Sequence, residues 1–284
     1  MLNSALRNVY YWIGDLQWIF RSPWVPSSRL SMAARLSFSS LADTLRLGLH
    51  SASPVPGVEV QFCNFSEYLV LFREIFVRQA YGMELSSPRP VILDCGANIG
   101  LATIYFKRRF PLARVIAFEP NPDSFSRLAA NIKRNDLEGI ELRNEALGGS
   151  NSTGYLVLPR GTSESHGASI SLSENDGSPS VPVQCILLSS VVENLERVDL
   201  VKLDIEGPEY EVLTDLERSG LLSRVGAFII EYHERLASGP IESALSLLAR
   251  NGFQFRLAVE WKPWYSFESP YPAMIYAARP RQPA

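Results

Sequence analysis

The chain has 284 residues, of which 46% are hydrophobic and 20% are charged, values typical of a globular protein with a substantial core. Its 14 Phe, 11 Tyr and 5 Trp exclude disorder for most of the chain, because these side chains supply ample apolar surface to bury. The formal net charge of −3 argues against nucleic acid as the main partner, which would favour a basic protein.

Cysteine usage and hydropathy indicate in which cellular compartment the protein is expected. Cys63, Cys95 and Cys185 have no metal-ligand spacing, and an odd set of this kind indicates a reducing environment. No stretch is long and apolar enough to predict a transmembrane helix, and the N-terminus lacks the pattern of a signal peptide. We therefore expect a cytoplasmic protein.

Residues 1–22 show apolar residues at helical spacing, crowded with Tyr and Trp. Asp15 and Gln17 interrupt this run, so the segment is not expected to span a bilayer. The predicted helix either packs on its own domain or docks on a membrane surface or a protein partner. In the membrane case the protein would be membrane-peripheral.

A second helical pattern begins at Leu30 and ends before the Pro-rich stretch 53–57. We place a domain boundary there. Residues 1–57 are predicted to be an N-terminal helical extension, and residues 58–284 to be the main domain.

The main domain is expected to begin with a strand at 58–63 and a helix at 67–81. From residue 91, short apolar runs alternate with amphipathic helices, the pattern of βαβ units in an α/β fold. The expected strands are 91–95, 114–118, 140–143, 198–203, 226–231, 253–259 and 273–277, and the expected helices include 101–109, 122–135 and 241–250. A region rich in Gly, Ser and Asn at 145–186 holds three more strand-like pieces.

The first strand of this series leads into the turn Asp94-Cys95-Gly96-Ala97-Asn98-Ile99-Gly100. In such a turn the glycines let the backbone approach a ligand, and the following helix offers free N–H groups. The spacing is G-x-x-x-G rather than the dinucleotide-binding G-x-G-x-x-G. Asp94 would repel a pyrophosphate, but it would attract a cofactor that carries a sulfonium or ammonium cation.

Acidic residues follow two of the later strands. Glu119, nineteen residues after Gly100, is expected to accept hydrogen bonds from the ribose hydroxyls of an adenosine cofactor. Asp204 and Glu206 follow the fourth strand, at the edge where ligands bind in such sheets, although helix capping is an alternative role.

His233 follows the fifth strand and is a candidate for proton transfer, because imidazole titrates near neutrality. His166, in the loop 163–169, is a weaker second candidate. Asp204, Glu206 and Glu231 could together hold a divalent metal, but no ligand spacing requires one.

Three segments taken together, ILDCGANIG at 92–100, AFEPNP at 117–122 and VKLDIEG at 201–207, resemble the FkbM family of S-adenosylmethionine-dependent methyltransferases over roughly residues 60–235. The resemblance implies a class I (Rossmann-like) methyltransferase fold, whose seven-stranded, mostly parallel sheet is flanked by helices and has an antiparallel last strand. It also implies methyl transfer from S-adenosylmethionine to a hydroxyl of a sugar, glycan or polyketide-type natural product. One departure is the stretch 186–189, where the family commonly has Thr-Leu-Asp.

The resemblance also suggests roles for individual residues. Asp94, Gly96 and Gly100 would line the methionine moiety, Glu119 would bind the ribose, and Ala146 would lie near the adenine. The predicted cofactor-binding set is completed by Asn98, Pro120, Asn121 and Asp204.

A base must take the proton of the acceptor hydroxyl, and the candidates are Asp204, Glu206 and His233. Location favours Asp204, whereas an unperturbed pKa of about 6.5 favours His233. The sequence leaves this order open.

Two other functions are weighed against this interpretation. A nucleotide-dependent oxidoreductase is disfavoured by the acid in the turn and the absent G-x-G-x-x-G. A non-catalytic cofactor-binding interaction module is disfavoured because Asp94, Glu119 and Asp204 are all present. The insertion at 145–186 and the N-terminal helices are expected to select the acceptor. Trp261, Trp264 and Tyr265 would either stack on a sugar or pack in the last hairpin.

Overall fold

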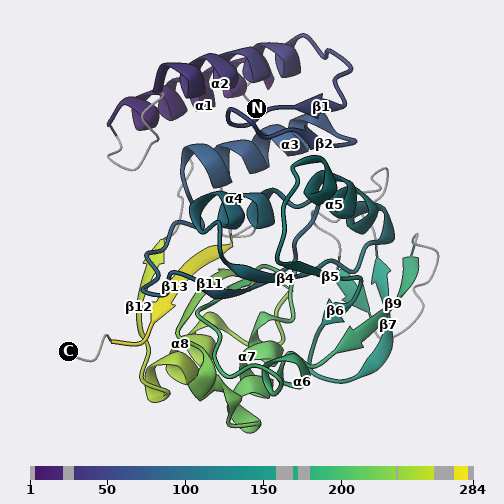
Figure 1. Ribbon diagram of the computed structural model, residues 1–284, viewed down its shortest axis with the longest axis vertical. Coiled ribbons are helices and arrows are strands. Elements are labelled where there is room, and N and C mark those ends of the chain that lie inside the picture. Colours follow the sequence, from purple (N-terminus) through teal and green to yellow (C-terminus); the bar gives the residue numbers. More distant parts are fainter. Residues whose placement is uncertain are drawn as a thin grey trace.

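A computed structural model describes residues 4–21, 29–157, 169–171, 180–234, 236–258 and 272–280. A seven-stranded sheet lies at its centre with helices on both faces, and a further helical layer covers one of those faces (Figure 1). No helix among the described residues is long and apolar enough to cross a membrane.

The central sheet confirms the expected topology. Its strands are β3 (Val91–Cys95), β4 (Arg114–Phe118), β5 (Ile140–Arg143), β10 (Leu200–Leu203), β11 (Ala227–Tyr232), β12 (Gln254–Ala258) and β13 (Ala273–Ala278). Their order is β12-β13-β11-β10-β3-β4-β5, and the last strand, β13, runs antiparallel to both of its neighbours. The strand order reverses between β3 and β10, so a ligand crevice is expected at their carboxyl ends.

Helices pack on the two faces of this sheet and form two separate apolar cores. One face carries α4 (Leu101–Arg109) and α5 (Pro122–Arg134), and the other carries α6 (Ser189–Val192), α7 (Glu209–Arg218), the 3-10 helix η2 (Leu221–Arg224) and α8 (Ile241–Arg250). Residues 101–107 of α4 are all buried, because this helix lies between the sheet and the N-terminal layer. The α4 sequence is accordingly apolar around most of its circumference.

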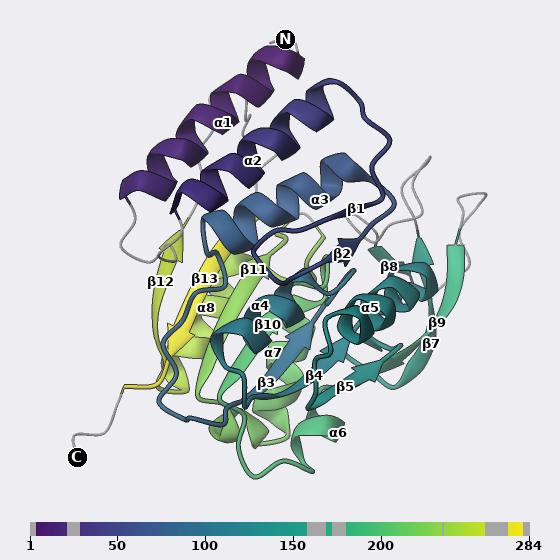
Figure 2. The same cartoon turned by 45° about the horizontal axis from the view of Figure 1, so that its top comes forward.

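The N-terminal layer packs on the rest of the chain. It comprises α1 (Ser4–Arg21), α2 (Arg29–Thr44), the short strands β1 (Ser51–Ala52) and β2 (Val60–Gln61), α3 (Phe65–Leu71) and the π-helix η1 (Phe72–Val77). Figure 2 shows α1, α2 and α3 side by side. Ile19, Met32 and Leu36 belong to the same core as α4 and β2. The domain boundary after residue 57 stays a prediction.

The helix expected at 67–81 is instead α3 continued by η1, and the strand expected at 58–63 is reduced to β2. In η1 the amide N of Arg78 donates to the carbonyl O of Arg73, five residues earlier (2.8 Å). This wider turn aligns Arg73 and Arg78, and both pair with Asp15 of α1 at 3.0 Å. The buried ion-pair cluster joins the N-terminal layer to η1.

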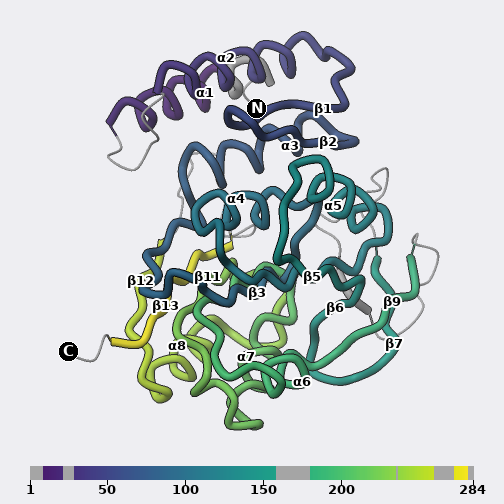
Figure 3. Tube along the Cα trace, viewed as in Figure 1, coloured from purple at the N-terminus to yellow at the C-terminus, as the bar shows by residue number. Residues whose placement is uncertain are grey.

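The insertion at 145–186 forms a separate small sheet beside β5 (Figure 3). Its strands are β6 (Ala146–Leu147), β7 (Ser152–Val157), β8 (Ser169–Ser171) and β9 (Ser180–Ile186), in the order β6-β9-β7-β8. The last inserted strand leads into residues 186–189, the stretch that departs from the pattern of the FkbM family. There the backbone N and Oγ of Ser189 donate to Asp215 of α7 at 2.8 and 2.7 Å, so a carboxylate of α7 binds the first residue of α6.

Candidate active site

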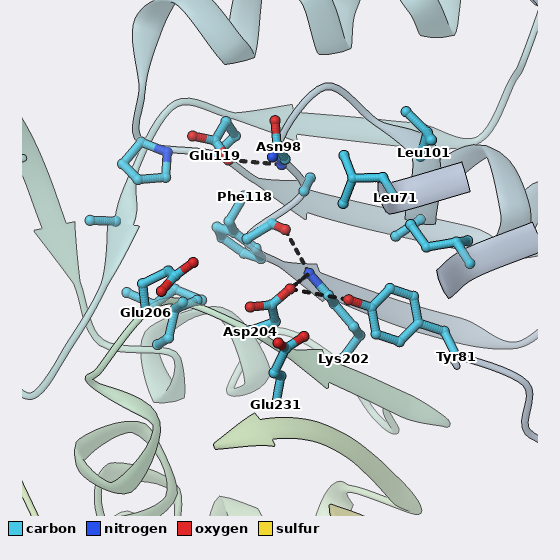
Figure 4. Close-up of a pocket in the computed structure, with 18 of the residues that line it drawn as sticks. Leu71, Tyr81, Asn98, Leu101, Phe118, Glu119, Lys202, Asp204, Glu206 and Glu231 are labelled. Carbon is cyan, nitrogen blue, oxygen red and sulfur yellow. Dashed lines mark hydrogen bonds and ion pairs between the residues drawn. The ribbon is translucent and has the colours of Figure 1, made fainter. Parts of the chain in front are cut away.

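A pocket opens at the carboxyl ends of β3, β4 and β10, where the strand order reverses (Figure 4). Its walls come from η1 and the neighbouring loops, the turn after β3, the end of β4, the inserted sheet and the ends of β10 and β11. The lining residues are Leu71, Glu74, Ile75, Tyr81, Gly96, Ala97, Asn98, Leu101, Ala102, Phe118, Glu119, Pro120, Glu145, Ala146, Leu147, Leu156, Lys202, Asp204, Ile205, Glu206 and Glu231.

The turn after β3 depends on two glycines in the left-handed region. Gly96 has φ +84°, and a Cβ at this position would overlap the carbonyl oxygen of Asp204. Gly100 has φ +94° and caps α4, and a Cβ there would lie 2.7 Å from Leu128 Cδ1. Glycine therefore allows the turn to pack directly against the strand end that carries Asp204.

Glu119 is held rigidly at the end of β4. Its Oε2 accepts from the backbone N of Asn98 (2.8 Å), and its Oε1 accepts from the backbone N of Asn121 (2.9 Å). The residue is 1% exposed, yet its side chain lines the pocket. Pro120 lines the pocket beside it, whereas Asn121 stands behind and caps α5 by accepting from Asp123 N (3.0 Å).

Lys202 is a buried cation at the centre of the site. Its Nζ donates to the carbonyl O of Gly96 (2.6 Å) and lies 3.1 Å from Asp204 Oδ2 and 3.6 Å from Asp94 Oδ1. Burial lowers the pKa of Lys202, but the two aspartates outweigh burial, so the net shift is upward. The ammonium therefore stays charged and ties the glycine turn to Asp204.

Asp204 receives two further contacts. Tyr81 donates its phenolic O–H to Asp204 Oδ2 (3.1 Å), as Figure 4 shows. Burial raises the pKa of Asp204, but Lys202 and His233 outweigh it and lower the pKa below the usual value for aspartate. Asp204 is thus a carboxylate at neutral pH and faces the pocket.

Asp94 lies beneath the turn rather than in the pocket wall. It is fully buried, and Thr103 donates its hydroxyl to Asp94 Oδ2 (2.5 Å). Burial raises the pKa of Asp94 above the usual value for aspartate, although Lys202 and the Thr103 hydrogen bond act in the opposite direction. Neither Asp94 nor Gly100 lines the pocket, so direct contact of either residue with a cofactor stays a prediction.

His233 stands behind the pocket carboxylates. Its Nδ1 lies 2.9 Å from Glu209 Oε1, and its Nε2 lies 3.4 Å from Glu206 Oε2 and 4.0 Å from Asp204 Oδ1. Burial lowers the pKa of His233, but the Glu209 hydrogen bond and the nearby carboxylates outweigh burial and raise the pKa to about 10. The unperturbed pKa of about 6.5, which favoured His233 as the base, therefore does not apply here, because the fold surrounds the ring with acids.

Glu231 faces the same group of charges. Its Oε1 lies 3.9 Å from His233 Nε2. Burial and the nearby Asp204 raise the pKa of Glu231 well above the usual value for glutamate. The pocket floor therefore combines carboxylates of different basicity.

One set of donor atoms could hold a divalent cation. Single atoms of Asp204, Glu206 and His233 lie within 4.8 Å of one another, whereas the sequence suggested Glu231 as the third ligand. The same carboxylates raise the pKa of His233 and so favour its charged form, in which the ring would be their cationic partner.

Of the predicted cofactor and catalytic residues, seven line one pocket: Gly96, Asn98, Glu119, Pro120, Ala146, Asp204 and Glu206. Sequence reasoning missed Lys202 as a site residue, although a charge inside the apolar strand β10 is a usable signal, since buried charges need partners. It also missed Tyr81, Glu74 and Leu71, which carry no local signal. His166, Trp261, Trp264 and Tyr265 lie outside the described residues.

Comparison with known proteins shows to which family the chain is similar. The family model described as "Methyltransferase FkbM domain" matches residues 94–255. Methyltransferase sdnD of Sordaria araneosa is 32% identical over 255 residues, covering 78% of this chain and 92% of that protein. The 31-O-demethyl-FK506 methyltransferase FkbM of Streptomyces tacrolimicus is 28% identical over 246 residues, covering 76% and 90%. The hexuronic acid methyltransferase AglP of Haloferax volcanii is 30% identical over 166 residues, covering 58% and 64%.

Proposed function

Because this chain belongs to the FkbM methyltransferase family, we propose that it transfers the methyl group of S-adenosylmethionine to a hydroxyl oxygen of a sugar, glycan or polyketide-type natural product. Two relatives have names that specify an acceptor, 31-O-demethyl-FK506 in one and a hexuronic acid in the other. The oxidoreductase alternative gains no support, since the matching family and the relatives are methyltransferases.

The observation that carries the proposal is the composition of the pocket. Glu119, fixed by two backbone amides, and the carboxylates of Asp204, Glu206 and Glu231 line a single cavity. An adenosine group with a sulfonium needs a ribose-binding acid and a second acidic region for the positive sulfur. The pocket supplies both.

Further residues fit the remaining parts of the cofactor. The apolar side chains of Phe118, Leu147 and Leu156 line the pocket together with Ala146 and suit the adenine ring. Gly96 and Asn98 would lie along the methionine moiety, with Asp94 and Gly100 supporting the turn from below. When bound, S-adenosylmethionine supplies the electrophilic methyl group.

The protein must position the acceptor oxygen in line with the methyl carbon and accept the hydroxyl proton. Positioning contributes up to about 7–11 kcal/mol, and a general base about 10²–10⁴-fold. Of the three candidate bases, Asp204 and Glu206 line the pocket and His233 does not. We therefore infer that a pocket carboxylate accepts the proton. The His233 imidazolium would then position the side chain of Glu206.

Calorimetric titration with S-adenosylhomocysteine tests the cofactor assignment. Glu119→Gln should weaken binding about 10–100-fold, because hydrogen bonds to a charged group are worth about 1.5–3 kcal/mol. Glu141→Gln, an exposed change on the adjacent strand β5, should leave binding unchanged. Binding of NADH instead, or of neither ligand, would overturn the proposal.

The acceptor is tested with S-adenosylmethionine carrying a CD₃ group and a panel of sugars, uronic acids and polyketide alcohols. NMR of the product should place the label on oxygen, and Asp204→Asn and Glu206→Gln should each reduce kcat. A label on nitrogen or carbon would contradict O-methylation. Tight S-adenosylhomocysteine binding without turnover of any acceptor would favour the interaction-module alternative.

A further inference from the structure

The outer side of the N-terminal layer exposes apolar side chains. Leu30, Ala34, Phe38 and Leu41 of α2, together with Leu45 just after its end, follow one another at intervals of three or four residues, and all are exposed. Leu30 is 78% exposed and Phe38 is 60% exposed. A surface helix normally presents polar residues to water. The apolar stripe of α2 instead lies on its solvent-facing side, which is unusual.

The neighbouring helix continues the same kind of surface. Among the α1 side chains that the structure describes, residues 9–21, the exposed large apolar ones are Val9, Tyr10, Ile13, Trp18 and Phe20. In Figures 1 and 2, α1 and α2 lie side by side at the end of the molecule away from α6 and α7, and no other described element covers their outer side. We call the exposed residues of these two helices the outer face.

The charged residues of the N-terminal segment are mainly basic. Residues 1–57 contain five arginines, two aspartates, and no lysine or glutamate, so their net charge is +3 in a chain whose total is −3. Arg21, Arg29 and Arg46 are exposed. Asp15 is buried against Arg73 and Arg78, and Asp43 is half-buried and accepts from Ser66 Oγ (2.5 Å), so neither acid is prominent on this surface.

We propose that the outer face docks the protein on the surface of an anionic lipid bilayer, with α1 and α2 lying in the plane of the interface. Exposed apolar side chains would enter the acyl boundary, Tyr10 and Trp18 would sit at headgroup level, and the arginines would contact lipid phosphates. A second copy would oppose one basic segment with another, whereas an anionic bilayer complements it. The sequence indicated residues 1–22 alone as a docking segment, and the structure extends the surface to α2.

The docked layer is joined to the pocket through η1. Asp15 of α1 pairs with Arg73 and Arg78, while Glu74 and Ile75 of the same short helix line the pocket. The docking proposal does not depend on the proposed acceptor, because no pocket residue belongs to the outer face.

Sedimentation of the full chain with vesicles tests the proposal. Binding to phosphatidylcholine vesicles containing about 30% phosphatidylserine should be at least about tenfold stronger than to pure phosphatidylcholine. It should weaken as NaCl rises from about 0.05 to 0.5 M, because salt screens exposed charges. Failure to bind either vesicle, or equal binding to both at all salt concentrations, would overturn it.

Paired variants locate the surface. Phe38→Glu with Leu41→Glu should lower vesicle binding at least about tenfold, because both side chains would enter the interface. Leu112→Glu, a change at an equally exposed leucine in the turn before β4, should leave binding unchanged. Arg21→Gln with Arg46→Gln should reduce the preference for phosphatidylserine.

Two controls keep these results interpretable. Retained S-adenosylhomocysteine affinity, or failing that an unchanged thermal unfolding transition, shows that a variant is folded. Light scattering of the vesicle-free protein reports self-association. If Phe38→Glu with Leu41→Glu dissociated a stable dimer and left vesicle binding unaltered, the outer face would be a dimer interface and the lipid proposal would be wrong.

Discussion

The pocket and the outer face depart from the usual distribution of side chains in opposite directions. At the pocket, Lys202, Asp94 and Glu119 are almost completely removed from water. On the outer face, Leu30 and Phe38 are more than half exposed. Buried charges and exposed apolar patches are the informative exceptions to normal burial, because each costs free energy unless something binds it.

The two regions differ in how the unusual burial or exposure of their side chains is stabilised. In the pocket, Lys202 and His233 form ion pairs with the surrounding carboxylates, so each buried cation has its counter-charge within the described residues. On the outer face, no other described element covers the apolar stripe, and under the docking proposal a lipid surface covers it. The charged site is thus preformed, whereas the outer face is proposed to bind a partner.

The largest expected effect is at the junction between the two regions. Asp15→Asn should lower the free energy of unfolding by about 3–5 kcal/mol, because it leaves the buried Arg73 without its counter-charge. Denaturant unfolding measures the loss. Glu196→Gln, at an exposed acid, should change stability by less than about 0.5 kcal/mol. A wild-type value for Asp15→Asn would show that the layer is not held by this cluster.

A smaller loss of stability, with a specific loss of binding, is expected inside the pocket. Gly96→Ala introduces a Cβ against the Asp204 carbonyl at a φ that L side chains rarely adopt, and should cost about 1–3 kcal/mol. Displacement of Asp204 should also abolish S-adenosylhomocysteine binding while leaving vesicle binding intact. Gly148→Ala, where no atom lies within 4 Å of the added Cβ, is the matched control. Unchanged cofactor affinity in Gly96→Ala would refute the role given to the turn.

The smallest effect, taken per pH unit, concerns the pH dependence of stability. The folded-state pKa of His233 is about 10, against 6.5 for the unperturbed ring. A raised folded-state pKa stabilises the protein fully below pH 6.5, and this contribution is lost as the pH rises towards 10. Between these values, wild type should lose stability faster than His233→Gln, by up to about 1.4 kcal/mol per pH unit.

Unfolding of both proteins between pH 6.5 and 9, with a chelator present to exclude metal ions, measures this difference. Parallel stability curves for wild type and His233→Gln would show that the ring is not charged in the folded state.

Local sequence patterns predicted much of the central sheet. β3, β4 and β5 have the expected bounds, because each is a short apolar run closed by polar or turn residues. Gly96, Glu119 and Asp204 were recognisable for a related reason, since the residues that follow parallel strands lie at one edge of the sheet. The register of β3 with β4 and β10 then brings them together.

Contacts between distant segments were not predictable in this way. Tyr81 donates to Asp204 across 123 positions of sequence, and the loop that carries it has no motif. The π-helical form of η1 was not predictable either, since the sequence pattern of these residues is that of an ordinary amphipathic helix. The inserted strands were foreseen as strand-like pieces, but their pairing into a separate sheet was not.

The amino-acid sequence by itself determined the order of strands and helices, the glycine turn and the acids that follow the strands, because these features depend on neighbouring residues. Only the tertiary structure decided the charge state of His233, the place of Asp94 beneath the pocket and the exposure of the apolar stripe on α2. The physical reason is that burial and Coulomb interactions depend on which distant groups the fold brings within a few ångströms. A histidine with an ordinary pKa in the unfolded chain thereby becomes a cation, and an amphipathic helix acquires two apolar faces.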